Sequence, residues 1–221
     1  MMLDNLKKYK VILASNSPRR KELLAGLGVE YEVRTLPDVD ESYPETLRGA
    51  DIPLYISREK ADAYRDMMHP DELMITADTI VWLDGQVLGK PKNREEAMQM
   101  LRDMSGRTHE VFTGVCITTT EWQRSFAAAT EVRFAKLSEE EIAYYVDKYQ
   151  PMDKAGAYGV QEWIGFIGVE NISGSYYNIM GLPVQNMYEE GSETSYAEIL
   201  MKELIQKDSK WFAAIYDMAN K

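Results

Sequence analysis

The chain has 221 residues, of which 45% are hydrophobic and 28% charged, a composition that is ordinary for an enzyme with one sizeable core. Its net charge of −11 argues against nucleic-acid binding, which needs a basic surface. The apolar runs are too short to cross a membrane, and residues 1–10 lack the apolar stretch of a secretion signal. We therefore expect a cytoplasmic protein without a membrane or nucleic-acid partner.

Two residue types that often carry catalysis are scarce in this chain. Its one cysteine, Cys116, cannot form an internal disulfide and lies in an apolar stretch, where a packed thiol is expected. Its two histidines, His69 and His109, are interpreted as surface or structural residues. Because this inventory excludes multi-histidine metal sites, the chemistry must depend on carboxylates, lysines and arginines.

The first expected elements are a short buried strand and a helix that begins with an unusual charge pattern. Residues 11–13 are valine, isoleucine and leucine, which predicts the strand. Ser17 fits an N-cap and Pro18 the first helical position. Arg19 and Arg20 then fall in the first turn, at the positive end of the helix dipole. A bound anion would resolve this unfavourable placement.

Two other helix starts follow the usual charge rule and serve as internal controls. Asn93 and Ser138 each open a capping box with glutamates in the first turn, ending at Glu96 and Glu141. The first helix instead combines free backbone amides with two guanidiniums, which predicts a phosphate-binding site. The alternative is a pair of surface arginines bonded to acids elsewhere.

The middle of the chain alternates apolar runs with helical periodicity. Asp78 and Thr79 interrupt an apolar strand that leads into Asp84-Gly85, a favoured hairpin turn. In chain order we expect the end of the first helix at Gly28, a strand over 31–36, a polar segment over 37–53, a helix over 52–69, strands over 73–83 and 86–88, and a helix over 94–104.

The remaining elements continue this alternation up to a change of character after residue 190. We expect strands over 111–119 and 125–134, a helix over 139–148, a glycine-rich loop over 151–161, a strand over 164–169, a turn over 171–175 and a short helix near Gly181. The pattern predicts an α/β fold with a central mixed β-sheet flanked by helices. We expect one domain over 1–190 and a C-terminal helical extension over 191–221.

Asp78 is the first candidate for chemistry, because a carboxylate in a buried strand needs a partner to offset several kcal/mol of desolvation. The plain alternative is a structural salt bridge. Lys90, on the glycine-flanked loop that follows the hairpin, could return close to the strand and supply the partner.

Further cations and carboxylates lie at intervals along the chain. A polyphosphate could be held by Arg19, Arg20, Lys60, Lys90 and Lys154. Glu41 and Asp78 offer hard oxygens for a divalent cation, Mg²⁺ or Mn²⁺, although an acidic pair such as Asp40 and Glu41 is usually solvated surface. Brought together, these groups would suit phosphoryl hydrolysis, in which one carboxylate deprotonates the attacking water.

Several motifs, in order from about residue 10 to 190, resemble those of the Maf-like nucleoside triphosphate pyrophosphatases. They are LASNSPRR at 13–20, REKA at 58–61, ADT at 77–79, GKP at 89–91, DKAGAYGVQ at 153–161, GS at 174–175 and GLP at 181–183. The resemblance implies a Maf/inosine triphosphate pyrophosphatase-like fold with a deep active-site cleft. It also implies hydrolysis of a nucleoside triphosphate to the monophosphate and pyrophosphate.

The resemblance also implies roles for particular residues. Asp78 matches the proton acceptor. Glu41 matches an acid that helps to bind the divalent cation, and Asp40 matches that acid less well. Thr79 and Gln161 match the branch that prefers dTTP and UTP, and a side-chain amide can pair with the carbonyl and imide edge of uracil or thymine. The matching substrate-binding set is Ser15, Arg19, Arg20, Lys60, Thr79, Lys90, Lys154 and Gln161.

Two other functions remain open from the sequence. One is the sibling branch of the family, which is associated with methylated guanine and other modified nucleotides. The other is a nucleotide-binding regulator of septum formation that does not hydrolyse its ligand. The extension over 191–221 departs from the family pattern, and we interpret it as a packed helix or a homodimer contact, with an interaction element as the alternative.

Overall fold

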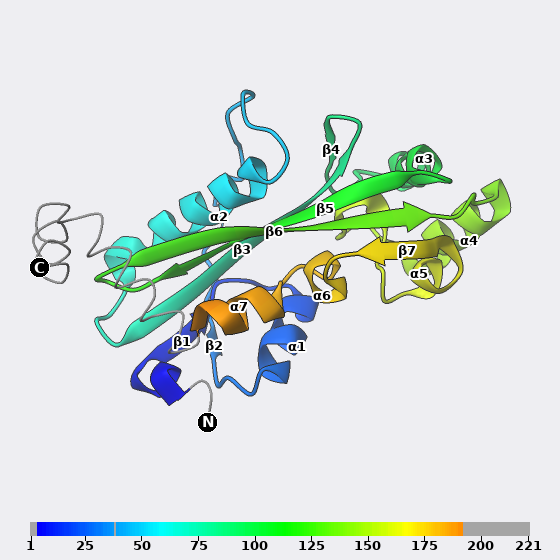
Figure 1. Ribbon diagram of the computed structural model, residues 1–221. Coiled ribbons are helices and arrows are strands. Elements are labelled where there is room, and N and C mark those ends of the chain that lie inside the picture. The colour runs from blue at the N-terminus through cyan, green and yellow to red at the C-terminus, as the bar shows by residue number, and fades with distance from the viewer. Residues whose placement is uncertain (1–3, 38, 192–221) are drawn as a thin grey trace, which may run out of the picture. The chain divides into compact units, whose positions relative to one another are not determined.

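The computed structural model describes residues 4–37 and 39–191 (Figure 1). Backbone contacts divide the chain into two units, Tyr9–Val184 and a smaller one of Met1–Lys8 with Gln185–Lys221. In the smaller unit the described elements are η1 (Asp4–Lys8) and residues 185–191 of α7 (Val184–Gly191). Residues 192–221, which make up nearly all of the expected helical extension, lie outside the described residues.

A mixed β-sheet forms the centre of the larger unit, as the alternation of elements predicted. Its strand order is β2-β1-β3-β5-β6-β7, with β4 paired to β3. The β1–β2 and β1–β3 pairs are parallel and the others antiparallel. The strands are β1 (Lys10–Leu13), β2 (Glu32–Val33), β3 (Glu72–Leu83), β4 (Gln86–Leu88), β5 (Thr108–Thr118), β6 (Gln123–Phe134) and β7 (Val169–Ser173).

Helices flank both faces of this sheet. Figure 1 shows α2 on one side of the long strands and α1 and α6 on the other. The helices of this unit are α1 (Pro18–Gly26), α2 (Asp51–Tyr64), η2 (Arg65–Met67), α3 (Arg94–Met104), α4 (Glu139–Tyr149), η3 (Ala155–Ala157), α5 (Trp163–Gly168) and α6 (Tyr176–Ile179). Among the described residues, none of the helices combines the length and apolarity that a membrane crossing needs.

The helix starts carry the predicted caps and charges. Ser17, Asn93 and Ser138 each accept a hydrogen bond from a backbone N–H three residues later. The first turns of α3 and α4 contain glutamates, whereas α1 has no acidic residue there. The contrast between α1 and the other two helices is therefore confirmed.

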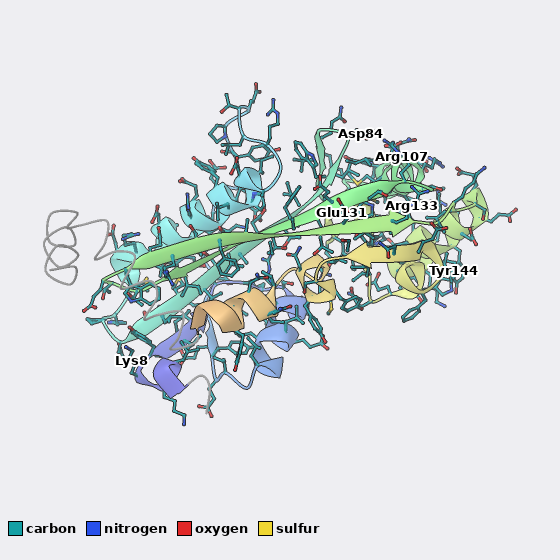
Figure 2. The ribbon with its side chains drawn as sticks, in the orientation of Figure 1. Lys8, Asp84, Arg107, Glu131, Arg133 and Tyr144 are labelled. Carbon is teal, nitrogen blue, oxygen red and sulfur yellow. The ribbon has the colours of Figure 1, made fainter. Side chains whose placement is uncertain are left out.

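The hairpin between β3 and β4 also forms as predicted. Asp84 and Gly85 have φ angles of 50° and 81°, the left-handed values that a two-residue turn of this kind requires. Figure 2 shows Asp84 on this turn near Arg107, with which it forms an ion pair.

Two expectations over the second half of the larger unit were wrong. Residues 164–169, predicted as a strand, lie mostly in the helix α5, and the turn predicted over 171–175 falls largely in β7. A short apolar run does not distinguish a strand from a helix by periodicity alone. At Gly165 a Cβ would lie 1.8 Å from the carbonyl oxygen of Val160, so the preceding loop packs directly on α5. That contact is tertiary and leaves no local pattern.

The predicted strand over 31–36 is reduced to the two residues of β2. Only Glu32 and Val33 find strand partners, because they pair with Ile12 and Leu13 at the end of the short strand β1. The chain that follows leaves the sheet and contributes to the candidate site.

Candidate functional site

A break in strand pairing along one edge of β3 creates the site. β1 pairs with residues 72–75 of β3 and β4 pairs with residues 81–83, so among the described residues no strand pairs with 76–80 on this edge. A cavity of about 540 Å³ lies here. Asp78 and Thr79 point to opposite faces of the sheet because strand side chains alternate, yet both line this cavity.

The cavity brings together every site residue predicted from the sequence. They come from the segments after β1, β2 and β4, from α1, α2 and β3, and from the glycine-rich loop around η3. The set is Ser15, Arg19, Arg20, Glu41, Lys60, Asp78, Thr79, Lys90, Lys154 and Gln161. Their roles in a reaction remain predictions.

Lys60 on α2 joins the two candidate carboxylates. Its Nζ lies 2.8 Å from Asp78 Oδ1 and 2.8 Å from Glu41 Oε1. The Lys60 and Asp78 side chains are 13% and 14% exposed, so this pair is largely shielded from water, whereas Glu41 is about half exposed. Burial raises the pKa of Glu41, but the hydrogen bond from Lys60 and the charges of Lys60, Lys90 and Arg20 outweigh it and lower that pKa. Glu41 is therefore ionised at neutral pH.

The close approach of α2 to the sheet depends on Gly114 of β5. A Cβ at Gly114 would lie 2.3 Å from the backbone of Pro53, so no larger residue fits beneath α2. Ile52 and Ile56 of α2 pack beside this point against the sheet. Lys60 follows about two helical turns later, which brings its side chain to Asp78.

Arg20 of α1 also lines the cavity, and its guanidinium links several segments of the cavity wall by hydrogen bonds. Its Nε donates to Gly181 O at 2.8 Å, its Nη1 to Ala77 O at 2.9 Å and to Ser15 Oγ at 3.4 Å, and its Nη2 to Thr79 Oγ1 at 3.1 Å. The bond to Ala77 satisfies a carbonyl on the edge of β3 that β1 leaves unpaired. Most of the five guanidinium N–H groups are thus used inside the protein.

Burial lowers the pKa of the Arg20 guanidinium, while the charge of Asp78 opposes that effect. Arg19, the other arginine of this helix turn, lies 3.3 Å from Asp153 Oδ2 through its Nη1. The two arginines therefore differ: Arg20 is fixed by four hydrogen bonds, and Arg19 makes one ion pair at the cavity wall.

Lys154 is held by two carboxylates, one of which the sequence reasoning missed. Its Nζ lies 2.8 Å from Asp153 Oδ1 and 3.1 Å from Glu162 Oε1. Glu162 in turn accepts a short hydrogen bond from the buried Tyr145 hydroxyl, which also accepts the Gly159 N–H at 3.0 Å. Burial raises the pKa of Tyr145, so the phenol keeps its proton. No local pattern links Glu162 to Tyr145, 17 residues apart.

The carboxylates offer a partial site for a divalent cation. Among the described residues there is no group of three or more His, Cys, Asp or Glu side chains that could hold a metal ion. Glu41 and Asp78 nevertheless converge on one cation, the Lys60 ammonium. Two protein carboxylates fit a Mg²⁺ or Mn²⁺ ion that takes its other ligands from phosphate oxygens and water. Asp40 bonds to Ser42 and is absent from the residues that line the cavity.

The two histidines and the cysteine are not among the residues that line the cavity. His109 is 2% exposed, its Nε2 lies 2.8 Å from the Tyr158 hydroxyl, and burial lowers its pKa to about 4. Cys116 is buried, and burial raises the pKa of its thiol, as expected for a packed cysteine. His69 is exposed, in line with its interpretation as a surface residue.

Comparison with known proteins places the chain among proteins of one family. The Maf-like protein family matches residues 10–193. A protein of Bacteroides thetaiotaomicron named dTTP/UTP pyrophosphatase is 76% identical over 189 residues, covering 86% of this chain and 98% of that protein. Proteins of the same name from Parabacteroides distasonis and Flavobacterium johnsoniae are 60% and 47% identical, covering 86% of this chain and 98% and 97% of their own lengths.

A solved structure of a HAM1 protein from Coxiella burnetii resembles the chain more distantly. The TM-score is 0.42 at 14% identity, covering 72% of this chain and 91% of that one. We draw no conclusion from a likeness at this level.

Proposed function

The chain belongs to the Maf-like protein family, and we propose that it hydrolyses nucleoside triphosphates, dTTP and UTP foremost, to the nucleoside monophosphate and pyrophosphate. The observation that carries this proposal is the Asp78 carboxylate, bonded to Lys60 in a cavity whose other walls supply Arg19, Lys90 and Lys154. Close relatives named dTTP/UTP pyrophosphatase support the choice of substrate.

We propose that a set of cationic side chains binds the triphosphate group of the substrate. Arg19, Lys60, Lys90 and Lys154 would contact phosphate oxygens, and the first-turn amides of α1 would add backbone donors. Arg20 and Ser15 would support the same wall with their remaining hydrogen-bonding capacity. Binding several phosphates at once orients the α-phosphorus toward Asp78, and orientation supplies much of the rate in such reactions.

In the proposed reaction Asp78 acts as the general base. Its carboxylate takes a proton from a water molecule, whose oxygen forms a bond to the α-phosphorus. The bond from that phosphorus to the bridging oxygen breaks, and pyrophosphate leaves. The Lys60 hydrogen bond holds the Asp78 carboxylate in one orientation.

Glu41 and Asp78 are the residues that would hold a divalent cation, Mg²⁺ or Mn²⁺, with the phosphates as its further ligands. When bound, such an ion neutralises negative charge on the phosphoryl oxygens.

We propose that Thr79 and Gln161 recognise the nucleobase. Both line the cavity, and an amide can pair with the carbonyl and imide edge of uracil or thymine.

We further propose that the protein is cytoplasmic, because nucleoside triphosphates are available there as substrates. The homodimer contact expected for the extension over 191–221 stays a prediction.

Pyrophosphate release from a panel of canonical and modified nucleotides, with Mg²⁺ or Mn²⁺, tests the proposal. We expect dTTP and UTP to be the best substrates and Asp78→Asn to lower kcat by about 10²–10⁴-fold, the usual contribution of a general base. Equal rates for the native protein and Asp78→Asn would remove Asp78 from this role. Preference for methylated guanine nucleotides would instead support the sibling branch, and binding without hydrolysis would support the regulator.

A further inference from the structure

The Thr79 hydroxyl belongs to a chain of hydrogen bonds that runs from α1 to α6 along one face of the sheet (Figure 1). Arg20 Nη2 donates to Thr79 Oγ1 at 3.1 Å, and Thr79 Oγ1 lies 2.9 Å from Thr113 Oγ1. Thr113 Oγ1 in turn lies 3.1 Å from the carbonyl oxygen of Asn178. Thr79 and Thr113 are direct cross-strand partners on β3 and β5, so their side chains share one face of the sheet.

The direction of these bonds follows from counting protons. A carbonyl oxygen has no proton, so the Thr113 hydroxyl must donate its only proton to Asn178. The Thr79 hydroxyl must therefore donate its proton to Thr113. Arg20 can only donate, so Thr79 accepts from it. One lone pair of the Thr79 oxygen is left for a ligand in the cavity, and no proton is left.

The reverse direction is disfavoured by burial. If Thr113 donated to Thr79, the Thr113 and Asn178 oxygens would face each other at 3.1 Å without a proton between them. Both residues are 0% exposed. The Asn178 carbonyl oxygen also accepts the Gly181 N–H at 2.9 Å, so the cost of the reverse direction is the repulsion between two buried oxygens that face each other without a proton. The Asn178 side-chain Nδ2 donates to Val111 O and Thr130 Oγ1, each at 3.0 Å. Asn178 is thus anchored and does not turn away.

We propose that Thr113 is a positioning residue that presents Thr79 to the nucleobase as a hydrogen-bond acceptor, and thereby favours uracil and thymine over cytosine. The inference rests on the proposed function and on Thr79 facing the base. The pairing edge of uracil or thymine carries one donor, the N3–H between two carbonyls, and an acceptor of fixed direction matches that donor. Cytosine has an acceptor at N3, which would face the Thr79 lone pair.

The test compares kcat/KM for UTP and CTP in the native protein, Thr113→Val and Thr113→Ser. Valine has the shape of threonine without the hydroxyl, so the Thr79 proton becomes free to turn toward cytosine N3. We expect the UTP-to-CTP ratio to fall about tenfold in Thr113→Val, the effect of one mismatched hydrogen bond. Thr113→Ser keeps the hydroxyl and should keep the ratio.

A double variant separates this positioning role from a merely structural one. In a Thr79→Ala background there is no hydroxyl to direct, so adding Thr113→Val should leave the UTP-to-CTP ratio unchanged. A further fall in that ratio would show that Thr113 acts through general packing and would overturn the inference.

A substrate-side measurement on the native protein covers the case in which Thr113→Val does not fold. A 5-fluorinated uridine triphosphate loses its N3 proton at lower pH than UTP because fluorine withdraws electrons. Since the fixed acceptor needs that proton, kcat/KM for the fluorinated substrate should fall relative to UTP as pH rises. A constant ratio across the pH range overturns the inference.

The outcomes also separate this inference from the proposed function. If the native protein releases pyrophosphate from neither UTP nor CTP, the proposed function fails and the inference fails with it. If the native protein prefers UTP and Thr113→Val keeps that preference, only the inference fails.

Discussion

Gly114 of β5 is the direct cross-strand partner of Asp78 of β3. The candidate base and the residue that lets α2 approach the sheet therefore lie side by side. Because a Cβ at Gly114 would lie 2.3 Å from the Pro53 backbone, the position of Lys60 on α2 depends on a glycine that has no chemistry of its own. This dependence can be tested through both stability and activity.

Gly114→Ala should lower the free energy of unfolding by about 1–3 kcal/mol, the usual cost of overpacking a core. It should also lower kcat/KM, because α2 must shift and carry Lys60 away from Asp78. Urea unfolding and pyrophosphate release measure the two effects. Gly26→Ala is the matched control, because a Cβ there meets nothing within 4 Å and alanine suits the end of α1. Equal stability of the two variants would contradict the close packing.

Lys60→Met should lower kcat/KM by about 10²-fold, because removing one partner of a shielded charge pair leaves Asp78 and Glu41 without their shared cation. The pyrophosphate-release assay with dTTP or UTP measures this loss. Lys92→Met, which removes an exposed lysine outside the cavity lining, should keep native kinetics. Native kinetics in Lys60→Met would exclude the ion pair from the reaction.

Glu72 should make the protein sensitive to acid. The hydrogen bond from Arg34, with Nη1 at 2.9 Å from Glu72 Oε2, lowers the pKa of this buried carboxyl from an ordinary 4.5 to about 2. The unfolded chain therefore takes up the proton first, and stability present above pH 4.5 is lost as pH falls toward 2.

Glu72→Gln should lose about 1–2 kcal/mol of unfolding free energy at pH 7, after allowance for screening of the partly exposed Arg34. The difference from the native protein should shrink between pH 4.5 and 2, because protonation removes the same charge from the native side chain. Urea titrations at several pH values measure this convergence. A difference that stays constant with pH would show that packing, and not ionisation, explains the loss.

Glu162→Gln should weaken substrate binding through Lys154. The variant keeps the shape of the side chain but removes a charge 3.1 Å from the Lys154 ammonium, which then has only Asp153 as its carboxylate partner among the described residues. We expect KM to rise about threefold to tenfold with a smaller change in kcat. Glu170→Gln, at an exposed ion pair with Arg133, is the control. A fall in kcat alone would contradict a binding role for Lys154.

The sequence by itself determined the capped starts of α1, α3 and α4, the hairpin turn and the ten candidate site residues that line the cavity. Caps and turns are local, since Ser17 or Asp84-Gly85 acts on backbone within a few residues. The charged site residues could be proposed because their types suit one chemistry, whereas Ser15, Thr79 and Gln161 came from the resemblance of short motifs to the Maf-like family. The same local reasoning failed over 164–169, where a short apolar run is equally compatible with a strand and a helix.

Only the tertiary structure decided what those residues contact. Arg19 and Arg20 are adjacent in the same helix turn, yet one makes an ion pair and the other is fixed to the cavity wall. Thr113 and Glu162 contact the cavity residues Thr79 and Lys154, which lie 34 and 8 residues away along the chain, and no sequence period encodes these contacts. The physical reason is that hydrogen-bond direction and burial depend on which segments pack together, and packing is a property of the whole fold.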